Sequence, residues 1–151
     1  MKLLKANENQ IRQLVELSKA AFDSDVNVGA PEAGGPPDYD SYEWHVNMMN
    51  EGHLFSAIEN DLLAGGAVLF LNENKKELFV GRIFINPEYH RKGYGTSLMK
   101  CIEKLYSDVE IICLDTPLWN KRTNQFYKKI GYVETGRDDD SVYYTKRIKR
   151  T

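Results

Sequence analysis

The chain has 151 residues, and its 20 Lys and Arg residues against 22 Asp and Glu residues give a formal net charge of -2. A surface without excess positive charge argues against nucleic acid as a partner. The length suits one domain over residues 1–151 with one hydrophobic core. The start MKLLKANENQ lacks the apolar stretch of a signal peptide, and no run of about 18 apolar residues could span a bilayer. We therefore expect a cytoplasmic protein without membrane contact.

Neither the cysteines nor the histidines have the spacing of metal ligands. Cys101 and Cys113 lie in separate apolar segments, which predicts a buried, reduced pair rather than a disulfide or a metal site. His45, His53 and His90 each lack a second ligand at metal spacing. The sequence therefore predicts no metal cofactor.

The first third of the chain changes from strand to helix and then to loop. Residues 2–6 suit a short strand, and the helix that follows ends near Asp23. Its apolar stripe consists of Ile11, Leu14, Val15, Leu17 and Ala21. The glycine- and proline-rich residues 25–40 predict a long loop of the kind that often serves as a lid or binding loop. A second helix is expected from Tyr42 and is closed by Gly52.

Three consecutive segments then have the apolar, β-branched composition of strands. They are residues 53–59, 62–71 and 77–85. Only short polar breaks separate them, so they predict three antiparallel strands joined by hairpins.

The second half of the chain predicts a strand, a glycine turn, a helix and a parallel strand. Past Gly95, one helical face carries Leu98, Ile102, Leu105 and Tyr106. Residues 109–114 are short and β-branched and predict a buried strand, which a right-handed crossover would place parallel to the strand before the turn. A further helix is expected over 120–130. Residues 132–137 and 142–148 predict a terminal hairpin.

The turn HRKGYG, residues 90–95, opens the helix after the third strand of the hairpins. A helix N-terminus offers up to four unpaired N–H groups and a dipole that favours an anion. Gly93 and Gly95 would let phosphate oxygens come close to the backbone. The same turn carries three basic residues, His90, Arg91 and Lys92. A plain turn without a ligand stays open as the alternative.

Two familiar phosphate-binding motifs do not fit this turn. A P-loop needs a lysine directly after its last glycine, but Gly95 is followed by Thr96 and Ser97. A Rossmann fingerprint needs a third glycine where the chain has Leu98. A phosphate site here must therefore be of another kind.

Two motifs resemble those of the GNAT superfamily of N-acetyltransferases. FINPEYHRKGYGTSLM, residues 84–99, resembles its acetyl-CoA pyrophosphate loop. NKRTNQFYKKIGY, residues 120–132, resembles its asparagine followed seven residues later by tyrosine, then by glycine and an aromatic residue. The order of elements also matches over nearly the whole chain. The departures are His90, where Gln or Arg is usual, and Thr123, where a small residue is usual.

The resemblance implies an α/β fold with a central mixed, mostly antiparallel sheet of about seven strands and about four flanking helices. It implies acetyl-CoA as the acyl donor, with the pyrophosphate on the glycine turn, the pantetheine along the preceding strand, and no metal. The residues that it assigns to acetyl-CoA are Ile83, Phe84, Ile85, His90, Arg91, Lys92, Gly93, Tyr94, Gly95, Thr96 and Asn120.

The resemblance also assigns Tyr127 as the general acid that protonates the departing CoA thiolate. From the sequence alone, Tyr127 could equally be a core tyrosine and Asn120 a helix cap. An acceptor amine with a pKa of about 10.4 must lose a proton before it attacks, so a base is needed. We assign Asp115 as candidate base or acceptor contact. Residues of the right chemistry elsewhere are Glu77, Asp38, Asp40, Glu43 and His45.

The sequence thus predicts an enzyme that moves an acetyl group from acetyl-CoA to a primary amine of an unidentified small molecule or peptide by direct attack. Residues 24–42 are where we expect the acceptor to be selected. Two alternatives stay open: a non-catalytic acyl-CoA-binding sensor or partner module of the same fold, and a domain that binds another nucleotide at the turn. Many family members dimerise, so a homodimer is a further expectation of the resemblance.

Overall fold

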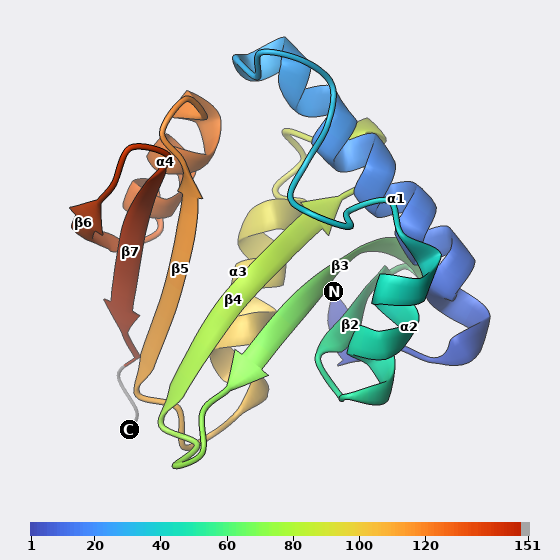
Figure 1. Cartoon of the computed structure of the whole chain (residues 1–151). Coiled ribbons are helices and arrows are strands. Elements are labelled where there is room, and N and C mark those ends of the chain that lie inside the picture. The colour runs from blue at the N-terminus through green and yellow to red at the C-terminus, as the bar shows by residue number, and fades with distance from the viewer. Residues whose placement is uncertain (149–151) are drawn as a thin grey trace.

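A computed structural model describes residues 1–148 (Figure 1). Within these residues the chain forms one sheet of seven strands and four α-helices. The strands are β1 (Lys2–Lys5), β2 (Leu54–Glu59), β3 (Leu62–Leu71), β4 (Glu77–Ile85), β5 (Ile111–Pro117), β6 (Val133–Arg137) and β7 (Ser141–Arg147). The helices are α1 (Ile11–Asp23), α2 (Tyr42–Asn50), α3 (Tyr94–Leu105) and α4 (Lys121–Lys129).

The strands follow the order β1-β2-β3-β4-β5-β7-β6 across the sheet. Every neighbouring pair is antiparallel except β4 and β5, which are joined through α3 and run parallel. The predicted α/β fold with a mixed, mostly antiparallel sheet and four helices is confirmed. The terminal hairpin is present too, with β7 inserted between β5 and β6.

Helices cover both faces of the sheet (Figure 1). The apolar stripe of α1 is buried on one face together with Phe84, and α2 packs beside it. On the other face α3 and α4 bury their apolar residues against a second cluster. Its helical members are Leu98, Met99, Ile102 and Tyr127. The sheet is therefore the middle of three layers, and a gap between two strands would connect its two faces.

Such a gap exists between β4 and β5. The two strands pair only from Glu77 opposite Ile111 to Val80 opposite Leu114. Beyond these pairs their carboxyl ends diverge, as Figure 1 shows. A bulge in β4 starts the divergence, since Val80 and Arg82 face consecutive residues of β3 and the residue between them, Gly81, is extra.

Glycine is required at the bulge because the neighbouring strand lies close. A Cβ on Gly81 would lie 2.7 Å from the ring of Phe70. The bulge also exchanges the faces to which β4 directs its side chains. Val80 packs in the core beneath α3, whereas Phe84 packs in the core beneath α1. The side chains of β4 thus change from one face of the sheet to the other at the point where the gap opens.

Some sequence-based boundaries differ from the structure. The loop expected over residues 25–40 begins with a 3-10 turn, Ser24–Val28, that extends α1. The strand expected to end at residue 114 continues to Pro117 because β7 pairs with it along its full length. Cys101 and Cys113 are free as predicted, but both are half-buried rather than buried. Alternation explains Cys113, since its neighbours Ile112 and Leu114 occupy the core side of β5.

Candidate active site

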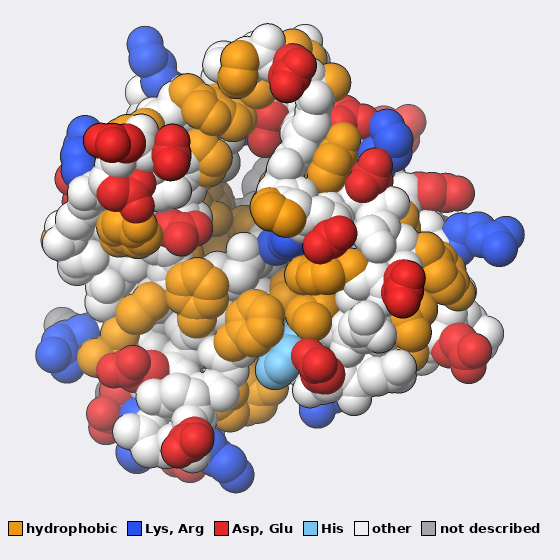
Figure 2. Space-filling model, in the orientation of Figure 1, with side chains coloured by type: hydrophobic (Ala, Val, Ile, Leu, Met, Phe, Trp, Pro, Cys, Tyr) orange, Lys and Arg blue, Asp and Glu red, His pale blue; other side chains and the backbone are white. Residues whose placement is uncertain are grey.

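A cavity of about 840 Å³ lies between the diverging ends of β4 and β5. Figure 2 shows it as a hollow on one face of the molecule, with acidic side chains on both sides. Its walls come from β4, the turn before α3, the end of β5, the start of α4, and residues 30–36 between α1 and α2. Segments from both faces of the sheet therefore meet in one space.

The glycine turn forms one wall with the first turn of α3. Gly93 has a φ of 80° and precedes the helix, which begins at Tyr94. The first hydrogen bond of the helix runs from the N–H of Ser97 to Gly93 O at 3.0 Å. The N–H groups of Tyr94, Gly95 and Thr96 come before it and have no acceptor within the helix. An ideal Cβ on Gly93 would meet no atom within 4 Å. The turn is thus open to a ligand and carries the positive end of the helix dipole.

The β4 strand forms the adjoining wall. From Arg82 to Ile85 one edge of β4 pairs with β3, whereas β5 pairs only as far as Val80. The opposite edge therefore presents backbone N–H and C=O groups to the cavity. A ligand with amide groups can pair with such an edge as an added strand would.

His90 does not supply the positive charge that the sequence suggested for it. Its Nε2 lies 3.2 Å from Ile85 O, and its Nδ1 lies 3.4 Å from the Arg122 guanidinium. Burial, followed by the charge of Arg122, lowers the pKa of His90. The imidazole is therefore neutral at pH 7, with Nε2–H donating to Ile85 O, and the local positive charge of the turn comes from Arg91 and Lys92.

The start of α4 is built around Asn120. Its side chain accepts a hydrogen bond from Thr123 N at 3.1 Å, which caps the helix as expected from sequence. The Thr123 hydroxyl in turn lies 2.6 Å from that of Thr116 on β5. Only 2% of Asn120 is exposed. These bonds fix the first turn of α4 against the end of β5.

Tyr127 follows two turns into α4 and lies both in the core and on the cavity wall. Its ring packs against those of Phe126, Tyr132 and Tyr144 at centroid distances of 5.2, 5.8 and 6.0 Å. Burial, and secondly the charge of Asp115, raise the pKa of Tyr127 well above its ordinary value. The hydroxyl therefore stays protonated at every physiological pH, as a proton donor must.

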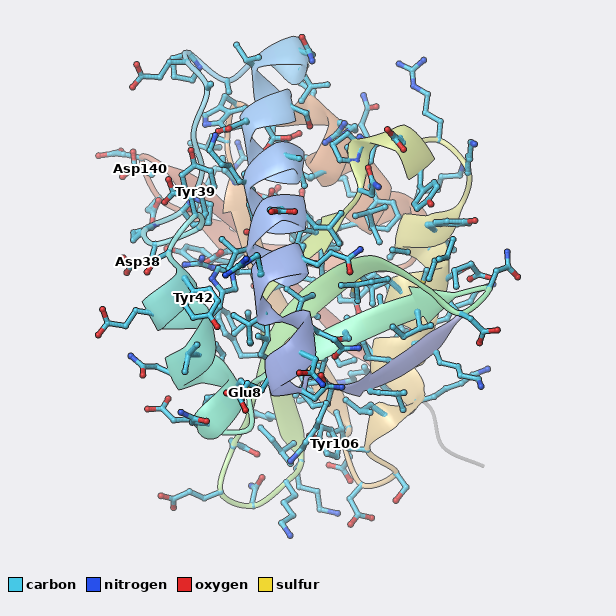
Figure 3. The ribbon with its side chains drawn as sticks, turned by 90° about the vertical axis from the view of Figure 1, so that its right-hand side faces the viewer. Glu8, Asp38, Tyr39, Tyr42, Tyr106 and Asp140 are labelled. Atoms are coloured by element: carbon cyan, nitrogen blue, oxygen red, sulfur yellow. The ribbon has the colours of Figure 1, made fainter. Side chains whose placement is uncertain are left out.

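Asp115 on β5 lines the cavity mouth. Desolvation, and secondly the charge of Asp138, raise the pKa of Asp115. None of the other five base candidates lines the cavity. Glu77 begins β4 at the opposite end of the strand, and His45 is fully buried with Nδ1 2.6 Å from Ser41 O. Asp38 projects outward from the molecule in Figure 3.

The cavity wall includes every predicted site residue except Lys92, whose side chain is exposed elsewhere. It also includes residues that sequence reasoning missed. Arg122 donates to Asp25 at 3.0 Å and so connects α4 with the turn after α1. Arg122 could have been suspected, since it lies in the α4 motif two residues after Asn120. No pattern in the sequence pairs it with Asp25.

The sequence pattern of the acetyltransferase (GNAT) family matches residues 12–132. The chain belongs to the GNAT family of acetyltransferases. The matched residues run from α1 to the end of the α4 motif and include the whole cavity wall except Ser141. No helix among residues 1–148 is long and apolar enough to cross a membrane, and these residues contain no group of three metal-binding side chains.

Solved structures of GNAT proteins have the same fold. A GNAT-family acetyltransferase from Streptococcus agalactiae has a TM-score of 0.83 and 19% identity, over 99% of this chain and 96% of that one. The PaiA N-acetyltransferase from Thermoplasma acidophilum, in complex with coenzyme A, has a TM-score of 0.80 and 18% identity, over 97% and 98%. The ribosomal-protein-S18-alanine N-acetyltransferase from Escherichia coli has a TM-score of 0.71 and 14% identity, over 99% and 95%.

Among curated proteins, the chain is similar to the uncharacterized protein YrkN of Bacillus subtilis. The two are 31% identical over 80 residues, which are 52% of this chain and 43% of YrkN. The match therefore spans less than half of the length of that relative.

Proposed function

We propose that this GNAT protein transfers the acetyl group of acetyl-CoA to a primary amine of a small molecule or peptide by direct attack. The observation that carries the proposal is the meeting of an open helix N-terminus and an unpaired strand edge in one cavity. The first suits a pyrophosphate and the second suits the amide groups of a pantetheine arm. The CoA complex of the PaiA N-acetyltransferase, which has the same fold, supports this choice of ligand.

In this proposal the cofactor residues of the turn and of β4 keep the roles that the family resemblance gave them. The turn from His90 to Thr96 holds the pyrophosphate through backbone N–H groups. The edge at Ile83, Phe84 and Ile85 holds the pantetheine, and a free N–H of this edge polarises the thioester carbonyl. Asn120 contributes through the cap that fixes the start of α4.

The reaction forms a C–N bond and breaks a C–S bond. The neutral amine attacks the thioester carbon, and the CoA thiolate leaves with the proton of the Tyr127 hydroxyl. The nitrogen of the new amide then loses its extra proton, which returns through water to the Tyr127 oxygen. The raised pKa of Tyr127 makes this transfer more uphill than for an exposed phenol, but a thiolate released in the same buried place also has a raised pKa. Asp115, at the cavity mouth, accepts a proton from the incoming ammonium group, directly or through water.

A thiol-release assay of the purified protein with acetyl-CoA and a panel of primary amines tests the proposal. We expect release of free CoA that depends on at least one amine and exceeds the rate without amine by tenfold or more. Tight binding of acetyl-CoA without release across small amines and peptide N-termini would instead support an acyl-CoA-binding module. Absence of both would overturn the proposed function.

A further inference from the structure

Arg82 is a half-buried cation in the cavity wall that the proposed chemistry does not use. It follows the Gly81 bulge, which directs its side chain to the face of the sheet covered by α1 and α2. Its guanidinium carbon lies 4.0 Å from the centroid of the Trp44 ring. One guanidinium nitrogen, Nη2, donates to Pro37 O at 2.5 Å. Stacking and this bond hold the guanidinium in one orientation.

The guanidinium of Arg82 is incompletely paired. Its Nη1 is buried and has no hydrogen-bond partner within the part of the chain that the structure describes. No carboxylate among residues 1–148 forms an ion pair with it. Burying a donor of a charged group without a partner is unfavourable, because the group loses its hydrogen bonds to water. A ligand in the cavity that supplies the missing acceptor would therefore gain binding free energy from this group.

Across the gap, on the other strand, lies an unpaired charge of the opposite sign. Val80 opposite Leu114 is the last pair between β4 and β5, and Arg82 and Asp115 each come just after it. Leu114 packs in the core beneath α3. Because side chains alternate along a strand, Asp115 lies on the opposite face, the face covered by α1 and α2, where Arg82 also lies. Asp115 forms no ion pair within the described residues. One side of the gap thus offers a cation and the other an anion.

We propose that Arg82 binds a carboxylate of the acceptor, so that the acceptor is an amino acid or a similar amine that carries a carboxylate near the reactive nitrogen. This inference rests on the proposed function. The planar fork of a guanidinium matches a carboxylate in two parallel hydrogen bonds. The carboxylate replaces the Pro37 carbonyl on Nη2 and supplies Nη1 with a partner. The ammonium end of the same molecule then lies towards Asp115.

At Arg82, on the side of the cavity proposed for the acceptor, a carboxylate fits better than a phosphate, whereas the pyrophosphate of CoA is proposed to lie on the turn before α3. The wall carries three acidic residues, Asp25, Glu32 and Asp115. Asp25 is already paired with Arg122, but the other two would repel a ligand with two negative charges more strongly than a ligand with one. A single guanidinium neutralises one carboxylate. A zwitterion adds no net charge to the acidic surroundings.

The first test compares acceptors that differ only in the carboxylate. Suitable pairs are leucine with isoamylamine, phenylalanine with phenethylamine, and lysine with cadaverine, each assayed by thiol release. We expect kcat/KM to be about tenfold or more higher for the carboxylate member of at least one pair. The Arg82→Gln variant should lose this preference while kcat/KM for the amine without a carboxylate stays within about threefold. The Arg82→Lys variant, which keeps the charge but not the fork, should retain part of it.

The second test needs no turnover. The chain has two tryptophans, so Trp119→Phe leaves Trp44, beside Arg82, as the fluorescent reporter. The probes are N-acetyl-leucine and N-acetyl-phenylalanine, with their uncharged amides as controls. We expect a saturable fluorescence change with the acids, none with the amides, and none in the Arg82→Gln variant of the same background. Thermal unfolding and acetyl-CoA binding of Arg82→Gln show that the variant is folded.

The two tests separate this inference from the proposed function. Equal responses to acids and amides, or unchanged acid binding in Arg82→Gln, would overturn the role of Arg82 whether or not the protein turns over. Thiol release that shows no carboxylate preference would overturn it while the acetyltransferase activity stands. Acid-specific fluorescence that depends on Arg82 would support it even if no amine in the panel releases CoA.

Discussion

At the scale of single residues, Tyr127 has to serve two purposes. Its ring belongs to the aromatic core of the α3 and α4 face, and it also lines the cavity. Burial in the core, which the sequence indicates for an amphipathic helical tyrosine, also raises the pKa of Tyr127 and keeps its hydroxyl protonated. The two readings of the sequence are therefore compatible, and only a variant that removes the hydroxyl alone distinguishes them.

The Tyr127→Phe variant should lower turnover about 10²-fold or more, because it removes the proton donor to the thiolate and keeps the ring. Acetyl-CoA affinity, measured by calorimetry, should change little. Tyr132→Phe is the matched control, since Tyr132 packs against Tyr127 and its hydroxyl donates to Glu103 at 3.1 Å, outside the cavity wall. Loss of acetyl-CoA binding in step with turnover would assign Tyr127 to packing.

Asp115 should give the rate a defined pH dependence. A carboxylate accepts a proton only when ionised, so kcat/KM should fall as pH drops through the Asp115 pKa, which is raised above its ordinary 3.8. Asp138→Asn removes the neighbouring charge that raises this pKa, so the acidic limb of the pH profile should move to lower pH. Its amide oxygen can still accept from Asp140 N and Ser141 N.

Asp139→Asn is the control for this shift, because Asp139 lies at the same hairpin tip and Asp138 is the carboxylate that acts on Asp115. The control should leave the pH profile in place. If the acidic limb of the pH profile does not move in Asp138→Asn, or is still present in Asp115→Asn, Asp115 is not the base.

At the scale of elements, the glycine turn is the feature whose place in the fold follows most directly from the sequence. Its position after a strand and before a helix follows from local signals, and the structure places both glycines and the free first turn of α3 on the cavity wall. The bulge at Gly81 was not predicted. It is a feature of the pairing of β4 with β3, where a Cβ on Gly81 would also meet the ring of Phe70, and a single segment carries no signal for such contacts.

Gly93→Val should weaken acetyl-CoA binding by tenfold or more and leave the fold intact. The side chain would enter the space of the pyrophosphate, where no protein atom lies within 4 Å of a Cβ. The φ of 80° also strains any residue with a Cβ by about 1–2 kcal/mol. Gly52→Val is the matched control, because Gly52 has a φ of 82° and lies outside the cavity wall. Equal acetyl-CoA affinity in the two variants would contradict the assignment of the turn.

The start of α4 gives a test of what Asn120 does. Asn120→Ala should destabilise the protein by about 1 kcal/mol through loss of the cap, whereas Asn120→Ser should retain most of this stability because serine caps nearly as well. Because only 2% of Asn120 is exposed, we expect acetyl-CoA affinity in Asn120→Ser to stay within about threefold of wild type. Tenfold weaker binding in a variant of unchanged thermal stability would show a direct contact with the ligand instead.

At the scale of the whole molecule, the position of the cavity follows from the layers. Helices on both faces bury the sheet, and the bulge and the short pairing of β4 with β5 open one passage between the faces. The open N-terminus of α3 lies on one face of the sheet. Arg82 and residues 30–36 line the same cavity from the opposite face. We infer that acetyl-CoA and the acceptor approach from opposite faces and meet between the two strands.

The sequence predicts the layers because periodicity and turn residues act locally, and the two motifs identify the α3 turn and the α4 helix. It does not predict the contacts that join distant segments across the passage. Arg122 with Asp25, and Arg82 with Trp44 and Pro37, each join residues at least 38 positions apart in the chain. Such pairs arise only from the packed fold, and they position Asp25, Arg82 and Arg122 of the cavity wall.

The measurement that tests the central claim most directly is a calorimetric titration of the purified protein with acetyl-CoA, with CoA, ATP and NAD as controls. We expect one site with micromolar affinity, about -8 kcal/mol, for acetyl-CoA and for CoA, and no heat with ATP or NAD. The Gly93→Val variant should lose this site. Absence of acetyl-CoA binding, or equal binding of ATP, would mean that the turn before α3 is not a CoA site and that the proposed function is wrong.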